Sequence, residues 1–439
     1  MRRVTILIIM MMAALVLFGC TMKTVEQMYC LPKRSQMYSN LQSAIDAAMP
    51  GLTYCAPLSG EHQQPIQMAD LDGDGVDECL LFAKSNEEHP LRVLVFRNVD
   101  GNYELSETVQ SNGSAFDQIE YVQMDNRDGV EVVIGKQVSD QVIRSVSVYS
   151  LRDNSVEQII SVNYSKFMTV DLDSDGLSEL MILRPGLAET DNGIVELYGV
   201  EDSTVERSIE VNMSQPADKL KRMITGKLHD GKLAVYVAST VGDNALITDV
   251  YTLVNGTLTN VTFSSESGTS VLTMRNFYVY ADDIDNDGVV ELPSLMTMKP
   301  KANSSSDSQN QLIRWFAMNS DGTEVDKMYT FHNFLDGWYV QLEKQWASHL
   351  TVASRNNCYS FYLWDPEYKT VDPIFNVYAY TGQDREQAAL ENGKFVLYTS
   401  ESTVFAASME PGADLIKLTQ DDVIYSFRLI QHDWKTGET

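Results

Sequence analysis

Three stretches of the sequence share one acidic pattern: DLDGDGVDE at residues 70–78, DLDSDGLSE at residues 171–179 and DIDNDGVVE at residues 283–291. Each follows a short apolar run, and the first two lead directly into another. Their starting points lie a little over one hundred residues apart, about twice the length of a strand-rich repeat of some fifty residues. The pattern therefore predicts a repeat fold that carries an acidic loop in every second unit.

Degenerate copies of the loop lie between the three, at residues 124–129 and 229–232. Each unit continues with alternating apolar residues and a turn such as Asp100-Gly101 or Asn255-Gly256, and these dipeptides are strong hairpin signals. A unit thus has about four strands. The length from residue 70 onward fits about seven units, so we expect an all-β fold, a seven-bladed β-propeller, with six or eight blades as alternatives. We expect the strand near residues 63–69 to close the ring by pairing with the last blade.

The spacing of the acidic residues is that of a calcium loop. Carboxylates at positions 1, 3 and 5 converge on a hard cation, a glycine at position 6 permits the sharp turn, and a glutamate at position 9 closes the site. The residue at position 7 offers its backbone carbonyl. About three structural Ca²⁺ sites are therefore expected, and the alternative is a plain Asp-Gly turn without metal. The predicted ligands are Asp70, Asp72, Asp74, Val76 and Glu78; Asp171, Asp173, Asp175, Leu177 and Glu179; and Asp283, Asp285, Asp287, Val289 and Glu291.

The two degenerate loops are expected to be empty. If Met124 takes position 1, the nearest glutamate, Glu131, falls one residue early, and the loop that starts at His229 lacks the acidic set.

The N-terminus has the pattern of a processing signal. Two arginines precede an apolar run at residues 4–18 that is too short to span a bilayer. The run ends in Leu17-Phe18-Gly19-Cys20, which resembles the lipobox of bacterial lipoproteins. That resemblance implies cleavage before Cys20, acylation of its sulfur and an extracytoplasmic, lipid-anchored protein.

The domain organisation follows from these features. We expect a lipoprotein signal peptide at residues 1–19, a lipidated tether at residues 20–60 and the propeller at residues 61–439. The tether contains one short helix, which starts near Ser39-Asn40 and stops at Pro50-Gly51. Cys79 is expected to be a buried apolar residue, and an oxidising compartment permits a Cys30–Cys55 bridge that spacing alone does not establish.

The repeats resemble FG-GAP or VCBS repeats, the calcium-stabilised blades of integrin α-subunit heads and many bacterial surface proteins. The match is carried by the three acidic loops. The chain ahead of the first loop also resembles the opening of an uncharacterised group of Gram-positive lipoproteins, in the segments Leu31-Pro32, Asn40-Leu41, Pro57-Leu58-Ser59-Gly60 and Gln67. These resemblances imply a calcium-bearing propeller with a recognition role, and no active site is carried over.

Composition narrows the function. The formal net charge of −28 on 439 residues argues against non-specific binding of nucleic acid, and 44% hydrophobic residues argue against a disordered chain. No GxSxG, GxGxxG, P-loop or HExxH pattern is present. We therefore expect a binding module for an envelope protein or glycan rather than an enzyme. The alternatives are a polysaccharide lyase or hydrolase on the same scaffold and a structural accessory of a membrane complex.

The tryptophans all lie in the last third of the chain. Trp338 and Trp364 stand near turns and are candidate ligand-facing aromatics. The favoured interpretation is that most aromatic residues there, including Trp315, fill the core between blades that lack calcium.

Overall fold

The computed structural model describes residues 36–138, 143–152, 155–188, 191–201, 204–276, 279–298, 311–363 and 372–430. The predicted signal peptide, Cys20, Cys30 and Trp364 lie outside the described residues. No helix in the described ranges is long and apolar enough to cross a membrane.

Within these ranges the chain forms six antiparallel sheets, numbered here in chain order, so the all-β prediction is confirmed. Sheets 1 to 3 consist of β1 (Thr53–Tyr54), β2 (Ile66–Ala69), β3 (Glu78–Lys84), β4 (Leu91–Val99) and β5 (Asn102–Ser111); β6 (Ala115–Val122), β7 (Glu131–Gln137), β8 (Arg144–Arg152) and β9 (Ser155–Tyr164); and β10 (Lys166–Val170), β11 (Glu179–Arg184), β12 (Ile194–Glu201) and β13 (Thr204–Asn212).

The remaining three sheets follow in the same manner, except that β27 returns to sheet 5. They consist of β14 (Leu220–Lys227), β15 (Leu233–Val241), β16 (Ala245–Val254) and β17 (Thr257–Asn260); β18 (Leu292–Thr297), β19 (Gln311–Met318), β20 (Glu324–Asn333), β21 (Trp338–Leu342) and β27 (Phe427–Leu429); and β22 (Leu350–Arg355), β23 (Cys358–Leu363), β24 (Pro373–Thr381), β25 (Phe395–Thr399) and β26 (Thr403–Met409).

Helices are few and short. They are α3 (Gln36–Ala48), α4 (Lys344–Ala347), α5 (Arg385–Ala388) and α6 (Gln420–Ser426), with 3₁₀ turns η1 (Ala217–Lys219), η2 (Val271–Thr273), η3 (Glu391–Gly393) and η4 (Pro411–Leu415). The predicted short helix is α3, which begins three residues earlier than its expected cap at Ser39.

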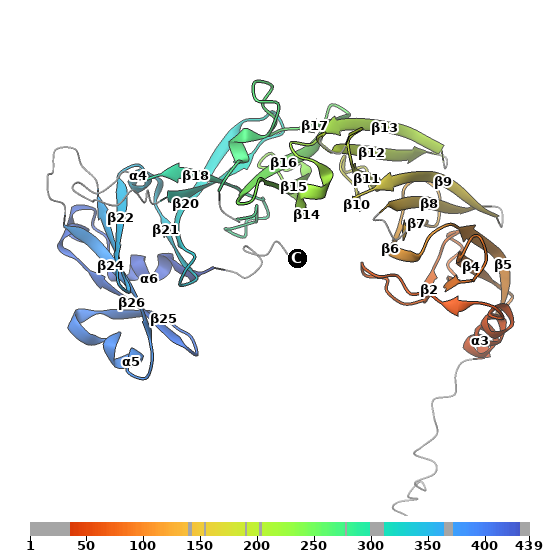
Figure 1. Cartoon of the computed structure of the whole chain (residues 1–439), viewed down its shortest axis with the longest axis horizontal. Coiled ribbons are helices and arrows are strands. Elements are labelled where there is room, and N and C mark those ends of the chain that lie inside the picture. The colour runs from red at the N-terminus through yellow and green to blue at the C-terminus, as the bar shows by residue number, and fades with distance from the viewer. Residues whose placement is uncertain are drawn as a thin grey trace, which may run out of the picture.

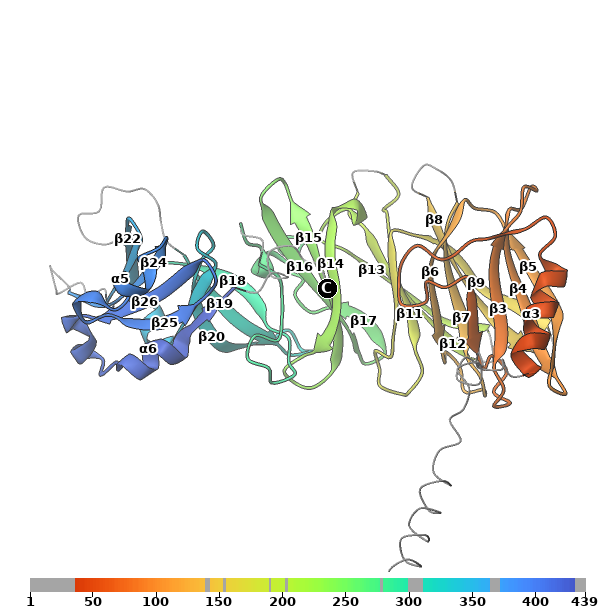
Figure 2. The same ribbon diagram turned by 90° about the horizontal axis from the view of Figure 1, so that it is seen from below.

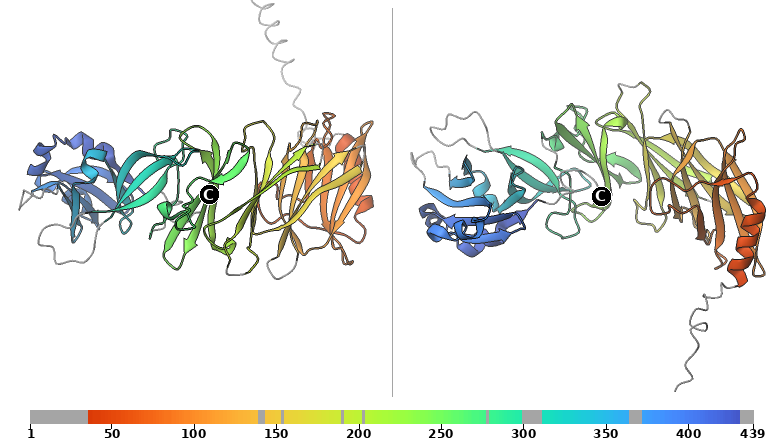
Figure 3. Two further views of the ribbon diagram at one scale, coloured as in Figure 1. Left: turned by 90° about the horizontal axis from the view of Figure 1, so that it is seen from above. Right: turned by 60° about the horizontal axis from the view of Figure 1, so that its bottom comes forward.

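The sheets follow one another like propeller blades along an open arc (Figure 1). The first strands of sheets 2, 3 and 4, β6, β10 and β14, lie toward the inside of the arc, and their last strands, β9, β13 and β17, lie toward the outside. Figures 2 and 3 show sheets 1 and 6 at opposite ends of an elongated molecule. The described residues form six such sheets, and the expected count of seven blades stays a prediction.

Alternation along the strands gives the sheets two apolar faces, each of which packs against the next layer. In β3, Leu80 and Phe82 join a cluster shared with sheet 2, whereas Cys79 and Leu81 belong to the cluster on the opposite face. The same alternation packs sheet 2 against sheet 3, where Val133 and Leu180 belong to one cluster. The other neighbouring sheets pack against each other in the same way. The core is therefore a series of layers, and the prediction that Cys79 is a buried apolar residue is confirmed.

The ends of the arc are covered by helices rather than by each other. α3 places Leu41 and Ile45 against the outward face of sheet 1, where Phe96 is fully buried. At the other end, α5 packs against β24 and β26 of sheet 6. Terminal caps of this kind are what an open array of repeats requires, because an uncovered apolar face would be exposed to water.

The expected ring closure is therefore wrong. The strand near residues 63–69 is β2, and it pairs with β3 in its own sheet, from Ile66 opposite Leu81 to Ala69 opposite Glu78. The last strand, β27, pairs with β21 of sheet 5. The physical reason is that α3 already covers the outward face of sheet 1, so the first sheet has no apolar face left to offer the last one.

Hairpin turns follow the predicted chemistry. Asp100-Gly101 and Asn255-Gly256 have left-handed backbone angles at both central residues, with φ of 51° and 87° in the first and 52° and 74° in the second. Such turns match the twist of the flanking strands. Pro293, two residues after the third acidic loop, lies inside β18 opposite Trp315. It is tolerated there because the inner neighbour of β18 is reduced to a single bridge, Asp282 to Glu291.

The cap of α6 gives a first prediction. The Thr419 hydroxyl accepts from the Asp422 backbone N–H at 3.2 Å, and the Asp422 carboxylate accepts from the Thr419 backbone N–H at 2.8 Å. Changing Thr419 to Ala removes half of this capping box and should cost about 1 kcal/mol of stability. Urea unfolding would measure the change. The comparison is Thr403→Ala, at the start of strand β26, where the threonine caps no helix. An unchanged midpoint would contradict this role of the cap.

Candidate metal sites

The three acidic loops occupy equivalent positions in sheets 1, 3 and 5. Residues 70–78 connect β2 to β3, residues 171–179 connect β10 to β11, and residues 283–291 lead into β18. The chain reverses within each loop, and the glycine at position 6 makes this possible, with φ of 84°, 94° and 86° at Gly75, Gly176 and Gly288. We refer to them as loops 1, 2 and 3.

One hydrogen bond recurs at the turn of every loop. The first aspartate accepts, through Oδ2, the backbone N–H of the glycine at position 6, at 2.9 Å in loop 1, 3.0 Å in loop 2 and 2.8 Å in loop 3. This contact folds the loop back on its first residue. It leaves the carboxylate of that aspartate at the centre of the turn.

A second recurring hydrogen bond orients the glutamate at position 9. Glu78, Glu179 and Glu291 accept through Oε2 the backbone N–H of the residue at position 2, at 2.9, 2.9 and 3.1 Å. Each glutamate begins the second strand or directly precedes it, so its side chain reaches back into the loop. All three are buried, with exposures of 3% or less.

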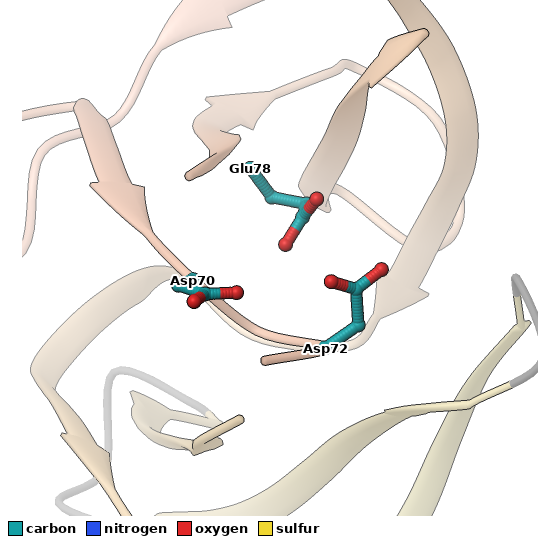
Figure 4. Close-up of side chains that lie close together, drawn as sticks. All are labelled: Asp70, Asp72 and Glu78. Atoms are coloured by element: carbon teal, nitrogen blue, oxygen red, sulfur yellow. The ribbon is translucent and has the colours of Figure 1, made fainter. Parts of the chain in front are cut away.

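The outcome is three matching clusters of carboxylates. In each, one oxygen from every member lies within 4.8 Å of the others, and Figure 4 shows the loop 1 carboxylates directed toward a common space. Such all-oxygen sets suit a hard cation. The clusters consist of Asp70, Asp72 and Glu78; Asp171, Asp173 and Glu179; and Asp283, Asp285 and Glu291.

The aspartates at position 5 are not part of these clusters. Asp74, Asp175 and Asp287 instead accept, through Oδ1, the backbone N–H at position 7, at 2.8, 2.8 and 2.9 Å. Their predicted role as ligands, and that of the carbonyls of Val76, Leu177 and Val289, stays a prediction.

Burial makes two of the glutamates costly to ionise without a cation. Removal from water raises the pKa of Glu78 to about 7 and that of Glu291 to about 8. Glu291 is fully buried, and its Oε1 has no hydrogen-bond partner. A bound divalent cation would give that oxygen the partner it lacks. This buried oxygen therefore supports a metal in loop 3 independently of the sequence pattern.

Basic side chains reach two of the loops from other strands. Arg97 in β4 donates to Asp72, and its Nε lies 4.0 Å from Glu78 Oε1. Lys327 in β20 donates to Asp287, and its Nζ lies 3.9 Å from Glu291 Oε1. Neither contact could be predicted from the sequence, because Arg97 and Lys327 lie 25 and 40 residues from the aspartates that they bind. A strand register is needed to bring them together.

The loop between β6 and β7 corrects the expected alignment. Glu131 accepts the Met124 N–H at 2.9 Å, which is the position 9 to position 2 contact of the acidic loops. Met124 is therefore at position 2, Gln123 at position 1, and Glu131 is in register rather than one residue early. Arg127 takes position 5, and its Nε lies 3.7 Å from Asp125. A guanidinium thus stands in this loop in place of a carboxylate.

This contrast gives a second prediction. Asp125→Asn should leave the calcium-dependent increase in melting temperature unchanged, because Gln123 stands in place of the first aspartate of the cluster and Arg127 brings a positive charge next to Asp125. The same substitution at Asp173 of loop 2 should reduce the increase. Equal losses in both variants would contradict the assignment of the loop at residues 123–131 as empty.

The loop at His229 serves as a contact between sheets. The Asp230 carboxylate accepts the backbone N–H and the hydroxyl of Ser320 at 3.0 and 2.6 Å, and these bonds lower the pKa of Asp230 although partial burial opposes them. It joins the first turn of sheet 4 to a turn of sheet 5.

The aromatic candidates need one correction. Trp338 does not face a ligand: it is fully buried, with its ring centroid 5.3 Å from that of Tyr359 and 5.8 Å from that of Phe427. Trp315 is also fully buried, as expected of a core residue. Trp338 is buried because β21 is an inner strand of sheet 5, between β20 and β27, and its side chain joins the cluster shared with sheet 6. Trp364 lies outside the described residues.

A cleft that no sequence motif indicated lies beside sheet 5. It has a volume of about 380 Å³ and opens between β20, β21 and α6. Its floor is apolar, with Val340, Leu342 and Phe375 all at least 95% buried. Trp346 and Tyr425 stand on its rim. Pockets of about 300–1,000 Å³ with an apolar lining and a few polar groups are typical ligand sites.

Comparison with solved structures gives distant matches. A rhamnogalacturonan lyase of Bacillus licheniformis is 12% identical over 54% of this chain and 57% of its own, with a TM-score of 0.30. The β-propeller domain of the Trilobed protease from Pyrococcus furiosus, described as having an open velcro topology, is 13% identical over 72% of this chain and 89% of its own, with a TM-score of 0.26. A Lactobacillus plantarum protein is 10% identical over 72% and 84%, with a TM-score of 0.25.

The chain therefore spans less than two thirds of the lyase that it matches. No family model and no curated protein sequence matches it. At these TM-scores the likeness carries no conclusion about ligand or activity.

Proposed function

We propose that the chain is a calcium-stabilised, extracytoplasmic binding module, held at the membrane through acylated Cys20, that recognises an envelope protein or a glycan. The observation that carries the metal part is the recurrence of one carboxylate cluster, with the same two backbone hydrogen bonds, at the first turn of sheets 1, 3 and 5. The lipobox-like Leu17-Phe18-Gly19-Cys20 supports the anchor.

Calcium is the cation that the donor set favours. The ligands are carboxylates on flexible loops, and Ca²⁺ accepts six to eight oxygens in variable geometry, whereas Mg²⁺ demands near-octahedral order. Extracellular sites of this kind bind calcium at about 10⁻⁴–10⁻³ M. Filled loops would hold the first turns of alternate sheets rigid and so stabilise the arc that presents the binding surfaces.

A retention assay tests the binding role. The full-length chain, purified in a mild detergent and immobilised, is presented with soluble polysaccharides and with peptidoglycan fragments in calcium buffer, and the eluates are assayed for new reducing ends and unsaturated sugars. Calcium-dependent retention without products supports the proposal. Turnover would favour the alternative, a polysaccharide lyase or hydrolase, and loss of all retention in the presence of calcium would count against a glycan-binding module.

A further inference from the structure

Lys327 links loop 3 to the cleft beside sheet 5. The pairing of β19 with β20 shifts at Trp315/Phe316, where Trp315 lies opposite Met328 and Phe316 opposite Asp326, so Lys327 is the extra residue of a β-bulge. Bulges redirect side chains away from the regular pleat. Here the ammonium donates to Asp287 of loop 3, while the same residue lines the cleft.

In loop 3 this ammonium stands where a metal would compete with it. Its Nζ lies 3.9 Å from Oε1 of Glu291, the buried oxygen that lacks a hydrogen-bond partner. A divalent cation that binds this oxygen takes its place beside the four carboxylates of the loop, lowers the negative charge that holds the ammonium, and repels the ammonium itself. The Lys327 side chain is only 15% exposed, and the cleft that it lines is the neighbouring space toward which a displaced head group would turn.

The displaced ammonium would then add positive charge to the cleft. Lys344 lines the same cleft and pairs with Asp326 at 2.6 Å, but its side chain is 71% exposed. Asp326 would stay neutralised, because Arg314 also binds it at 2.5 Å. Two acidic residues also line the cleft: the Asp422 carboxylate is engaged by the N-terminus of α6, and Glu343 is exposed and accepts from the Gln345 amide. Two ammonium groups would therefore be available to an anionic ligand, because the carboxylates that they leave are paired with other cations.

The remainder of the lining suits a sugar ring. An apolar floor and the indole of Trp346 match the C–H face of a pyranose, and the Gln341 amide and the Ser426 hydroxyl can bond to ring hydroxyls. A carboxylate on the sugar would account for the lysines. These features together describe a uronic acid rather than a neutral sugar.

We propose that the cleft between β20, β21 and α6 binds a carboxylated sugar, and that a divalent cation in loop 3 strengthens this binding by releasing Lys327 toward the cleft. The inference rests on the proposed function in one respect, the metal in loop 3. Linkage then requires the reverse effect as well: the bound sugar must tighten calcium binding at loop 3 by the same factor.

Titration calorimetry of the full-length chain tests this with trigalacturonate as the probe and a neutral galactose trisaccharide as the control. Trigalacturonate should bind roughly tenfold more tightly in millimolar calcium than in chelator, within the usual range of coupling between sites. The neutral trisaccharide should show no such dependence. Calcium that binds but leaves the trigalacturonate affinity unchanged overturns this inference alone, whereas a chain that binds no calcium overturns the proposed function with it.

Two variants separate the coupling from a structural defect. Lys327→Gln, in a background where Asp72→Ala and Asp173→Ala disable loops 1 and 2, should bind calcium more tightly because the tethered competitor is gone. Its trigalacturonate affinity should no longer respond to calcium. Lys344→Gln should weaken trigalacturonate binding and leave calcium affinity unchanged. Weaker calcium binding by Lys327→Gln, with a native circular dichroism spectrum, would refute the coupling.

Discussion

In millimolar calcium, the full-length chain should melt several degrees higher than in excess chelator. The proposed calcium sites exist only in the folded chain, so a site with a Kd near 10⁻⁴ M would add about 1.4 kcal/mol at 1 mM calcium. Three sites add about 4 kcal/mol, a large fraction of the stability of an ordinary domain. Asp171→Ala combined with Asp173→Ala should abolish about a third of the increase.

The control must change the same amount of charge elsewhere. Glu88 and Glu386 are exposed and lie outside the loops, so Glu88→Ala with Glu386→Ala removes two negative charges without touching a cluster. This variant should keep the full calcium effect. If it lost as much of the increase as the loop 2 variant, the effect would be general screening of a protein with net charge −28. The loops would then not be the cause.

Without a cation, stability should fall as the pH rises from about 5 to about 8. In the folded chain the pKa of Glu78 is about 7 and that of Glu291 about 8, both raised from 4.5 mainly by burial. The folded state therefore binds more protons than the unfolded state in this window, and unfolding is favoured as the protons are lost. Each glutamate contributes a slope of at most about 1.4 kcal/mol per pH unit.

Urea unfolding in chelator at a series of pH values measures this slope. Glu291→Gln cannot ionise but keeps an oxygen for the Ile284 N–H, so its slope should be smaller than that of the natural chain. In chelator above pH 8 the variant should be the more stable protein, and in calcium the less stable one. A variant that is less stable under both conditions at every pH would show that the carboxylate matters for packing and not for holding a cation.

The repeat pattern determined most of what could be predicted. The spacing of Asp70, Asp72 and Glu78 depends only on local turn geometry, so the carboxylates that meet in space are already adjacent in the chain. The same holds for the hairpin at Asn255-Gly256, whose turn type follows from two residues. The alternation of side chains along a strand is likewise a local signal. It places Cys79 and Leu81 on the same face of β3.

Features that depend on register between distant strands were not predictable. Lys327 reaches loop 3 only because a bulge in β20 turns it, and Arg97 reaches loop 1 only through the pairing of β3 with β4. The open arc has the same origin: α3 was expected as a helix, but its apolar face does not tell which sheet it covers. Glu131 was assigned to the wrong loop position because the loop was aligned by its acidic residues. Its position is given instead by its hydrogen bond to the Met124 backbone N–H.

Equilibrium dialysis against radioactive calcium tests the central claim most directly, because it counts ions rather than their consequences. At millimolar free calcium the account predicts three ions per chain, one for each carboxylate cluster, and two for the variant in which Asp171 and Asp173 are both alanine. A chain that takes up no calcium under these conditions, or one that takes up as much after the loop 2 substitutions as before, would contradict it.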